Sequence, residues 1–462
     1  MKNSKKVLEY ARAHFNEVHH TTLNPEGPGV VRIHLVPPKM EDDEIGPSVA
    51  IINGQDIIPV YTSWSILLTE FIEQVNEYNG REITEEDFKD ILNKTCKTIK
   101  KIYPLLPKSF IKKDLFRIMN TFKQVAYREK VDEEIGYMSI GEYAQYMKAP
   151  HRMDLMVSAM EKNGKWNCNQ QCVHCYAAGQ ARANESELDT ESWKKIIDKC
   201  KAIGIPQLTF TGGEPTMRAD LTELIEYASW FVTRLNTNGI VLTKGYCEKL
   251  KAVSLDSMQI TFYSSDEKIH NLLVGAEQYN NTVNGIKNAL EAGISVSINT
   301  PLCTLNKDYL KTLEFLHGLG VLYVTCSGLI TTGNAELESS EKLQLSSDEI
   351  KDILIKATKY CADNGMEISF TSPGWVENEF CDSIGLNPPT CGACLSNMAI
   401  TPSGKVVPCQ SWLSDDALGD MLNDEWDSIW DNDNCIVRRN YSAKMEGKCP
   451  LRKSSKEGKD NE

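Results

Sequence analysis

Three cysteines lie close together in the stretch KWNCNQQCVHCYAAG, which spans residues 165–179. Cys168, Cys172 and Cys175 are separated by three and then two residues, with four asparagines and glutamines around them. A structural zinc site needs four closed ligands, and no cysteine or histidine at zinc-finger spacing completes this one. A redox-active CxxC pair needs no third cysteine. A [4Fe–4S] cluster normally takes four thiolates, so three would leave one iron free to bind another molecule.

A second motif follows about thirty residues later, at the end of an expected strand. A helix-like stretch over residues 190–203 leads to a strand over residues 207–210 and then to TGGEP, residues 211–215. Gly212 and Gly213 let the backbone approach a ligand closely. The carboxylate of Glu214 suits a cationic amino group, so this turn is a candidate ligand-binding loop.

The C-x3-C-x2-C spacing, together with the GGE turn, resembles the signature of the radical S-adenosylmethionine (AdoMet) enzymes. The resemblance implies that the triplet holds a cluster whose open iron chelates AdoMet, and that the GGE turn contacts the methionyl amine. It also implies further AdoMet contacts from the backbone of residues 328–330 and from four side chains: His174, Tyr176, Thr261 and Asn299. A donor such as flavodoxin or ferredoxin would reduce the cluster, and a 5′-deoxyadenosyl radical would take hydrogen from the substrate. No catalytic residue is expected beyond the cluster ligands.

Strands and helices alternate downstream, which predicts an α/β fold with a parallel sheet. Expected strands end in polar or glycine-rich turns, and a helical pattern over residues 281–292 lies between two of them; the strands cover residues 234–239, 257–264, 294–302 and 321–336. They resemble successive strands of the partial (β/α)6 TIM-like barrel of this superfamily, here over residues 151–375. In such barrels the chemistry gathers at the carboxyl ends of the strands.

Further cysteines gather near the carboxy terminus. CGACLSNMAITPSGKVVPC, from Cys391, contains C-x2-C-x9-G-x4-C, and TPSGKVVPC predicts a hairpin that returns Cys409 beside Cys394. The pattern resembles the start of the SPASM extension, which holds auxiliary iron–sulfur clusters. Full SPASM domains continue with C-x2-C-x5-C-x3-C, whereas the segment GKCPLRKSSKEGKDNE offers one cysteine, Cys449. We therefore expect a shortened, twitch-like extension over residues 376–455, followed by a charged tail over residues 456–462.

The shortened extension would hold a single auxiliary [4Fe–4S] cluster. Its expected ligands are Cys391, Cys394, Cys409 and Cys449. Cys435 is the rival fourth ligand. A zinc ribbon is the alternative interpretation of this region, although such sites typically contain two CxxC pairs and this region contains only one.

The first 150 residues lie outside the expected barrel. VVRIHLVPP alternates apolar and polar residues as a half-buried strand does, and Asn53-Gly54 in SVAIINGQDIIPV predicts a hairpin. One helix follows with an apolar face made of Trp64, Leu67, Leu68, Phe71 and Val75. Thr84 and Asp87 predict the cap of a second helix. This winged-helix-like module over residues 1–110, joined by a helical connector over residues 111–150, resembles the module with which peptide-modifying radical AdoMet enzymes capture a leader peptide as an added strand.

Composition narrows the partners and the compartment. The chain has 462 residues, with 50 basic and 64 acidic side chains and a net charge of −14. This charge opposes nucleic acids and anionic membranes. No stretch approaches the ~18 apolar residues of a membrane-spanning helix, so a cytoplasmic protein with reduced thiols is expected. Six scattered cysteines are expected to be small buried residues: Cys96, Cys200, Cys247, Cys303, Cys326 and Cys361.

Three classes of function are compatible with these patterns. The first is an enzyme that crosslinks, epimerises or oxidises a ribosomally made peptide carrying a leader. The second is a small-molecule radical AdoMet enzyme of cofactor or natural-product biosynthesis, which the single auxiliary cluster favours. The third, a non-enzymatic iron–sulfur or DNA-binding regulator, has no use for the GGEP turn. Sulfatase maturases are related but carry an acidic residue after the cysteine aligned with Cys409, where this chain has Gln410.

Overall fold

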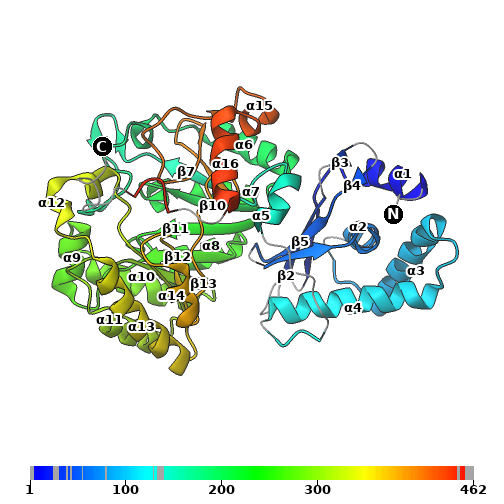
Figure 1. Cartoon of the computed structure of the whole chain (residues 1–462), viewed down its shortest axis with the longest axis horizontal. Helices are drawn as coiled ribbons and strands as arrows, with labels where there is room; N and C mark the ends of the chain where they lie inside the picture. The colour runs from blue at the N-terminus through cyan, green and yellow to red at the C-terminus, as the bar shows by residue number, and fades with distance from the viewer. Residues whose placement is uncertain are drawn as a thin grey trace. The chain divides into compact units, whose positions relative to one another are not determined.

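The computed structural model describes residues 5–23, 31–37, 40–41, 44–54, 56–78, 81–127, 129–132, 140–444 and 448–452. The chain divides into two compact units, and Figure 1 labels the elements of both. The first unit comprises residues 1–151 and 200–206, and the second comprises residues 152–199 and 207–462. Within the described ranges, no helix has both the length and the apolar character needed to cross a lipid bilayer.

The first unit contains a four-stranded antiparallel sheet followed by helices. The strand order is β1 (His19–Leu23), β2 (Val31–Val36), β5 (Ser48–Ile52) and β6 (Asp56–Val60), and β3 (Met40–Glu41) pairs separately with β4 (Glu44–Ile45). The helices are α1 (Lys5–His14), α2 (Thr62–Asn76), α3 (Glu85–Ile102), α4 (Lys108–Ala126) and α5 (Ile140–Tyr143). Apolar side chains of α1 to α4 and of the sheet form one core, to which α4 contributes Ile111, Leu115 and Ile118.

Local signals in this unit produce the expected turns and caps. Asn53 and Gly54 have φ values of 50° and 69° between β5 and β6, as the predicted hairpin requires. Thr84 and Asp87 form a reciprocal capping box at the start of α3. All six scattered cysteines of the chain are buried, also as expected.

One prediction for this unit was wrong. Strand β2 is buried on both faces rather than on one, because Arg32 and His34 have exposed fractions of only 7% and 0%. The His34 ring stacks on the His20 ring of β1 with 4.5 Å between ring centroids. Alternation of polar and apolar residues indicates which side chains share a face, but it does not show that the polar face meets water.

The second unit is built on a parallel sheet, which confirms the α/β class. Its parallel strands are β7 (Arg152–Ser158), β10 (Gln207–Gly212), β11 (Val232–Thr237), β12 (Ser257–Thr261), β13 (Ser295–Pro301), β14 (Tyr323–Ser327) and β15 (Glu367–Phe370). They lie side by side in this order. The run from β7 to β15 thus contains seven parallel strands, one more than the six of the expected barrel.

Helices of this unit connect the parallel strands, and Figure 1 shows α9, α10, α11 and α13 together on one side of them. The helices that follow successive strands are α6 (Thr190–Ala202), α7 (Leu221–Tyr227), α8 (Lys244–Ala252), α9 (Glu267–Val274), α10 (Tyr279–Glu291), α11 (Tyr309–Gly318), α12 (Glu338–Glu341), α13 (Ser347–Asp363) and α14 (Asn378–Ser383). Strand β7 is followed instead by a small hairpin of β8 (Glu161–Lys162) and β9 (Lys165–Trp166), and then by the cysteine triplet. The triplet is therefore at the carboxyl end of the first parallel strand.

The carboxy-terminal cysteine region extends the same sheet. Strand β16 (Asn397–Ile400) pairs in parallel with β7, and β17 (Lys405–Val407) and β18 (Gly419–Asp420) follow as antiparallel neighbours. The predicted hairpin is confirmed, since the Cys394 amide donates to the Pro408 carbonyl at 3.2 Å, directly before Cys409. Helices α15 (Trp426–Trp430) and α16 (Asp433–Lys444) complete the region.

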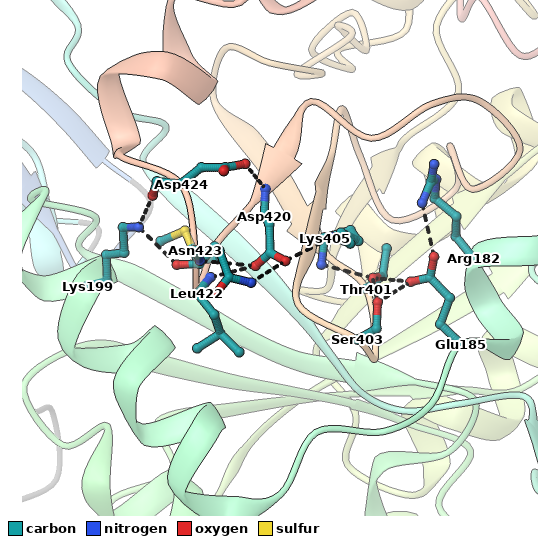
Figure 2. A network of polar contacts seen from close by, with 11 residues as sticks. Arg182, Glu185, Lys199, Thr401, Ser403, Lys405, Asp420, Leu422, Asn423 and Asp424 are labelled. Atoms are coloured by element: carbon teal, nitrogen blue, oxygen red, sulfur yellow. Dashed lines mark hydrogen bonds and ion pairs between the residues drawn. The ribbon is translucent and has the colours of Figure 1, made fainter.

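Figure 2 shows the polar contacts that hold this hairpin on its own unit. The Glu185 carboxylate accepts hydrogen bonds from the Thr401 and Ser403 hydroxyls, both at 2.6 Å, and its other oxygen lies 3.0 Å from Arg182. Lys405 pairs with Asp420 at 2.9 Å across β17 and β18. The carboxy-terminal cysteines are therefore anchored to the loop that follows the triplet.

Candidate active site

The loop that carries the triplet is held by two other segments of the second unit. The amides of Gln171 and Val173 donate to carbonyls at the end of α9, at 2.9 and 3.0 Å. Asn334 donates its amide to the Cys175 carbonyl and its side chain to the Cys172 carbonyl, at 2.9 and 3.1 Å. Main-chain groups that no helix or strand satisfies are thus paired, and the three thiols are presented on a defined loop.

Two glycines permit this close packing around the loop. Gly275 has φ = 65°, and a Cβ there would lie 2.4 Å from the Gln171 carbonyl oxygen. Gly333 has φ = 59°, and a Cβ there would lie 2.5 Å from the Cys175 carbonyl oxygen. Any other residue at either position would push the triplet loop out of place.

The three thiols line a cavity of about 700 Å³. Burial raises the pKa of Cys168 to about 12, so the thiols need bound cations to exist as thiolates at neutral pH. Among the described residues, no three cysteine, histidine or acidic side chains converge as ligands of one metal ion. Three cysteine thiols that do not converge on one point fit a [4Fe–4S] cluster, because each thiolate ligand of such a cluster binds a different iron.

The GGE turn lies at the end of β10, in the wall of the same cavity. Gly212 has φ = 138°, and a Cβ there would lie 2.3 Å from the Ser158 carbonyl oxygen of β7. Gly212 is therefore required by its close contact with the neighbouring strand. The sequence pattern predicts a different reason, which is that the backbone there approaches a ligand. The Glu214 carboxylate is buried and accepts from the Thr237 hydroxyl at 2.6 Å and the Asn238 amide at 2.8 Å.

Burial raises the pKa of Glu214, whereas its hydrogen bonds to threonine hydroxyls and backbone amides favour the ionised form. The carboxylate is thus fixed in direction at the cavity wall. A bound ammonium group would remove the unfavourable effect of burial. Glu214 fits the expected contact with a cationic amine.

The structure brings the other expected cofactor contacts to this cavity. His174, Tyr176, Thr261 and Asn299 all line it, as do residues 328–330. The His174 ring meets Tyr263 edge to face at 5.1 Å, and the Asn299 side chain accepts from Thr325 at 2.9 Å. The amide of Gly328 already donates to the Ser372 hydroxyl at 2.9 Å, so it is not available to a ligand.

Sequence reasoning missed several polar side chains that line the cavity. Arg152 and Arg234 line it, and Arg152 forms an ion pair with Asp154 at 3.0 Å. A signal for Arg234 was present in RLNTNG, where Arg234, Asn236 and Asn238 alternate along a strand and must share one face. No local signal identified Arg152.

The carboxy-terminal cysteines gather in one region. The thiols of Cys394 and Cys435 lie close to each other. Burial raises the pKa of Cys409 to about 12, and the nearby thiols of Cys449 and Cys391 contribute in the same direction. Of the two candidates for the fourth ligand, Cys435 is thus close to Cys394, and Cys449 is close to Cys391 and Cys409. Gly392, Gln410 and Ser411 from this region line the cavity that the triplet also lines.

Comparison with known proteins identifies two domains. The radical SAM superfamily model matches residues 167–316, and the model of the SPASM iron–sulfur cluster-binding domain matches residues 391–451. The chain is 30% identical over 211 residues to an Fe-coproporphyrin III synthase of Methanosarcina barkeri. The match covers 43% of this chain and 52% of the relative. It thus spans about half the length of that relative. An AdoMet-dependent heme synthase of the same organism is 26% identical over 307 residues, or 62% of this chain and 85% of the relative.

Solved structures extend the similarity over most of the chain. Streptococcus suis SuiB, solved bound to the precursor peptide SuiA, matches with a TM-score of 0.59 and 14% identity, over 87% of this chain and 92% of SuiB. SuiB has also been solved bound to S-adenosylmethionine, with the same TM-score. At this identity the match establishes a shared fold.

Proposed function

We propose that this chain, a radical SAM enzyme with a SPASM domain that uses [4Fe–4S] clusters and AdoMet, modifies a ribosomally made peptide. The observation that carries the proposal is the open edge of the sheet in the first unit. A fold match over 87% of the chain must reach into that unit, which supports a shared architecture with SuiB there. The peptide would bind the open edge as an additional strand.

Strand β6 is the edge that favours such binding. Among the described residues, no strand pairs with its outer side. Pro59 lies in this strand opposite Val49, and because proline has no N–H, its nitrogen must face away from β5. Residues two apart point their backbone groups the same way, so the N–H and C=O of Ile57 also face outward. Ile57 thus offers a donor and an acceptor to an added strand.

The opposite edge of the sheet is less open. Strand β1 has its His20 carbonyl occupied by the Asn76 side chain at 2.8 Å. A peptide that paired there would have to displace this contact. The two edges therefore differ, and the proposal assigns the peptide to β6.

The cavity of the second unit suits the reacting part of the substrate. When bound, the reduced cluster and AdoMet supply the radical that takes a hydrogen atom from the substrate. The triplet would hold that cluster, and Glu214 would orient the amine of AdoMet. At about 700 Å³ the cavity is in the range of small-molecule sites, so AdoMet and only a few peptide residues would fit together. Its walls would keep water from the reacting carbon.

A second candidate function is the modification of a tetrapyrrole. It is favoured by the curated relatives, which are named Fe-coproporphyrin III synthase and AdoMet-dependent heme synthase. Their matches cover 43% and 62% of this chain, so part of the chain lies outside each of them. The two candidates use the same cavity and differ in what the first unit does.

The test uses the anaerobically reconstituted full chain with reductant and AdoMet. Synthetic peptides from short reading frames beside the gene, and iron coproporphyrin III, would be offered separately and followed by mass spectrometry. The proposal expects a mass change in a peptide. Ile57→Pro removes the outward donor of β6 and should raise the peptide KM roughly threefold to tenfold, the effect of one hydrogen bond, with unchanged kcat. Ile57→Ala, which keeps the N–H, is the matched control.

Two outcomes would contradict the proposal. Turnover of iron coproporphyrin III with no change in any peptide would establish the second candidate. Equal peptide KM values for Ile57→Pro and Ile57→Ala would refute strand addition at β6. In both variants AdoMet cleavage without peptide should equal that of the wild type, which checks that the second unit is intact.

A further inference from the structure

We propose that Arg152 and Arg234 form a subsite that binds a carboxylate group of the substrate. The inference deepens the proposed function, because it rests on this cavity being the substrate site. It specifies the chemistry at the far end of the cavity from the GGE turn. The substrate class it names is a molecule with a carboxylate close to the carbon that reacts.

Both guanidinium groups belong to neighbouring parts of the parallel sheet. Arg152 opens β7, and Arg234 is the third residue of β11. The register aligns Thr209 of β10 with both Asp154 and Arg234, so these three residues lie at one level of the sheet. Arg152 and Arg234 both line the cavity and are close enough for the charge of one to affect the other.

The charges at this level do not balance. Asp154 is ion-paired with Arg152 at 3.0 Å, whereas within the described ranges no carboxylate lies at ion-pair distance from Arg234. Arg234 donates one hydrogen bond, to the Ser297 hydroxyl at 3.2 Å. Burial and the charge of Arg152 lower the pKa of Arg234 to about 10, so it remains a cation at neutral pH. Two cations and one anion leave an excess positive charge that a bound carboxylate would neutralise.

Unpaired polar atoms surround the same position. In the part of the chain that the structure describes, the Thr209 hydroxyl and the Asn236 side-chain oxygen are buried without hydrogen-bond partners. Both residues line the cavity, beside Arg234 in sequence or in register. Buried polar atoms are normally satisfied, so their state indicates a missing polar ligand, and the Asn236 oxygen, which only accepts, needs an N–H or O–H group of that ligand. The Thr209 hydroxyl can donate to a carboxylate, and a guanidinium can bind one in bidentate fashion.

The subsite is distinct from the region assigned to AdoMet. AdoMet is expected at the carboxyl ends of the strands, where Ser158 ends β7 and the GGE turn ends β10. Asp154 precedes Ser158 by four residues, which corresponds to about 13 Å along a strand. Arg234 lies at the level of Asp154, so a ligand there occupies the other end of the cavity. A carboxylate held here would fix the substrate beneath AdoMet.

The experiment uses the reconstituted holoenzyme with AdoMet bound, at constant ionic strength. N-acetylglutamate α-amide and its glutamine analogue, which differ in one charge, are added at millimolar concentration and binding is followed by the shift in Tm and by ligand-observed NMR. The glutamate probe should bind and the glutamine probe should not. Arg234→Gln should weaken binding of the glutamate probe at least about tenfold, as the loss of a charged hydrogen bond does. Arg117→Gln, a change on the first unit, is the control.

A second variant should act in the opposite direction. Asp154→Asn removes the competing anion and should tighten binding of the glutamate probe, an effect that general damage to the fold would not produce. Arg234→Gln leaves the Arg152–Asp154 pair intact, so it should fold, and its AdoMet affinity should equal that of the wild type. The subsite is overturned if neither the glutamate probe nor coproporphyrin III binds more weakly to Arg234→Gln than to the wild type. Reduced AdoMet affinity in Arg234→Gln would also overturn it, by assigning Arg234 to AdoMet.

A further binding measurement, with coproporphyrin III as the ligand, decides whether the carboxylate belongs to a peptide or to a porphyrin. Coproporphyrin III carries propionate groups, which present the same chemistry as a glutamate side chain. If it binds in an Arg234-dependent manner while the glutamate probe does not, the carboxylate subsite stands and the peptide assignment fails. If only the glutamate probe depends on Arg234, both the subsite and the peptide assignment are supported.

Discussion

Replacing Glu214 by glutamine tests the assignment of the GGE turn with a change of one atom. In the wild type, one carboxylate oxygen accepts from the Thr216 amide and hydroxyl and from the Thr237 hydroxyl, and the other accepts from the Asn238 amide. Glutamine can keep its oxygen toward the threonines, but its NH2 group then faces the Asn238 amide. One buried donor is left without an acceptor, which costs about 1–3 kcal/mol of stability.

The larger effect should be on AdoMet. Loss of a charged hydrogen bond to the ammonium group costs about 1.5–3 kcal/mol, or roughly 10- to 150-fold in Kd. Equilibrium binding to the anaerobically reconstituted protein measures this Kd, and iron content checks that the cluster is present. Glu223→Gln is the matched control, because Glu223 is half exposed and pairs with Lys194 at 2.6 Å on the surface. Wild-type AdoMet affinity in Glu214→Gln would refute the assigned role of this carboxylate.

Three other predictions follow from the site and its supports. The wild type should hold about eight irons. Changing the three cysteines of the triplet to alanine should remove half of them and abolish 5′-deoxyadenosine formation, whereas the double variant Cys394→Ala, Cys409→Ala should lose the other half. Twelve irons or bound zinc in the wild type would contradict this prediction. Glu185→Gln disturbs the contacts of Figure 2 and should lower stability by about 1–3 kcal/mol, seen as a lower Tm, with an unchanged Tm as the contrary result. Burial lowers the pKa of His151 to about 4 in the folded protein, so as the pH falls below 6.5 the unfolded chain binds this proton before the folded protein does. The wild type should therefore lose about 2 kcal/mol of folding stability between pH 7 and pH 5 that the His151→Phe variant keeps. Parallel profiles of Tm against pH for the two proteins would contradict this prediction.

Sequence reasoning succeeded where the signal is local. The spacing of the triplet, the GGE turn and the hairpin before Cys409 are each contained in fewer than twenty residues. The same holds for the capping box of Thr84 and Asp87. In each case a few neighbouring side chains determine the backbone, so the pattern predicts the geometry without knowledge of the rest of the fold.

It failed where a feature depends on the register of distant strands. Arg152 and Arg234 meet only because β7 and β11 both pair with β10, and one sequence does not show that register. Asp154 interrupts an apolar stretch and is intelligible only beside Arg152. The burial of Arg32 and His34 likewise depends on what covers β2. Polar residues inside a cavity are therefore the part of this site that a structure adds.

The pairing of β7 with β16 has a consequence for biosynthesis. Strand β7 ends at Ser158 and its neighbour on one side begins at Asn397, so a ribosome must add more than two hundred residues before that side of β7 can be covered. At cellular rates this takes on the order of ten to fifty seconds. Throughout that time the nascent chain exposes an unpaired strand edge, a state prone to aggregation. We expect chaperones to associate with β7 during synthesis, and stalled chains that end before residue 397 to be insoluble.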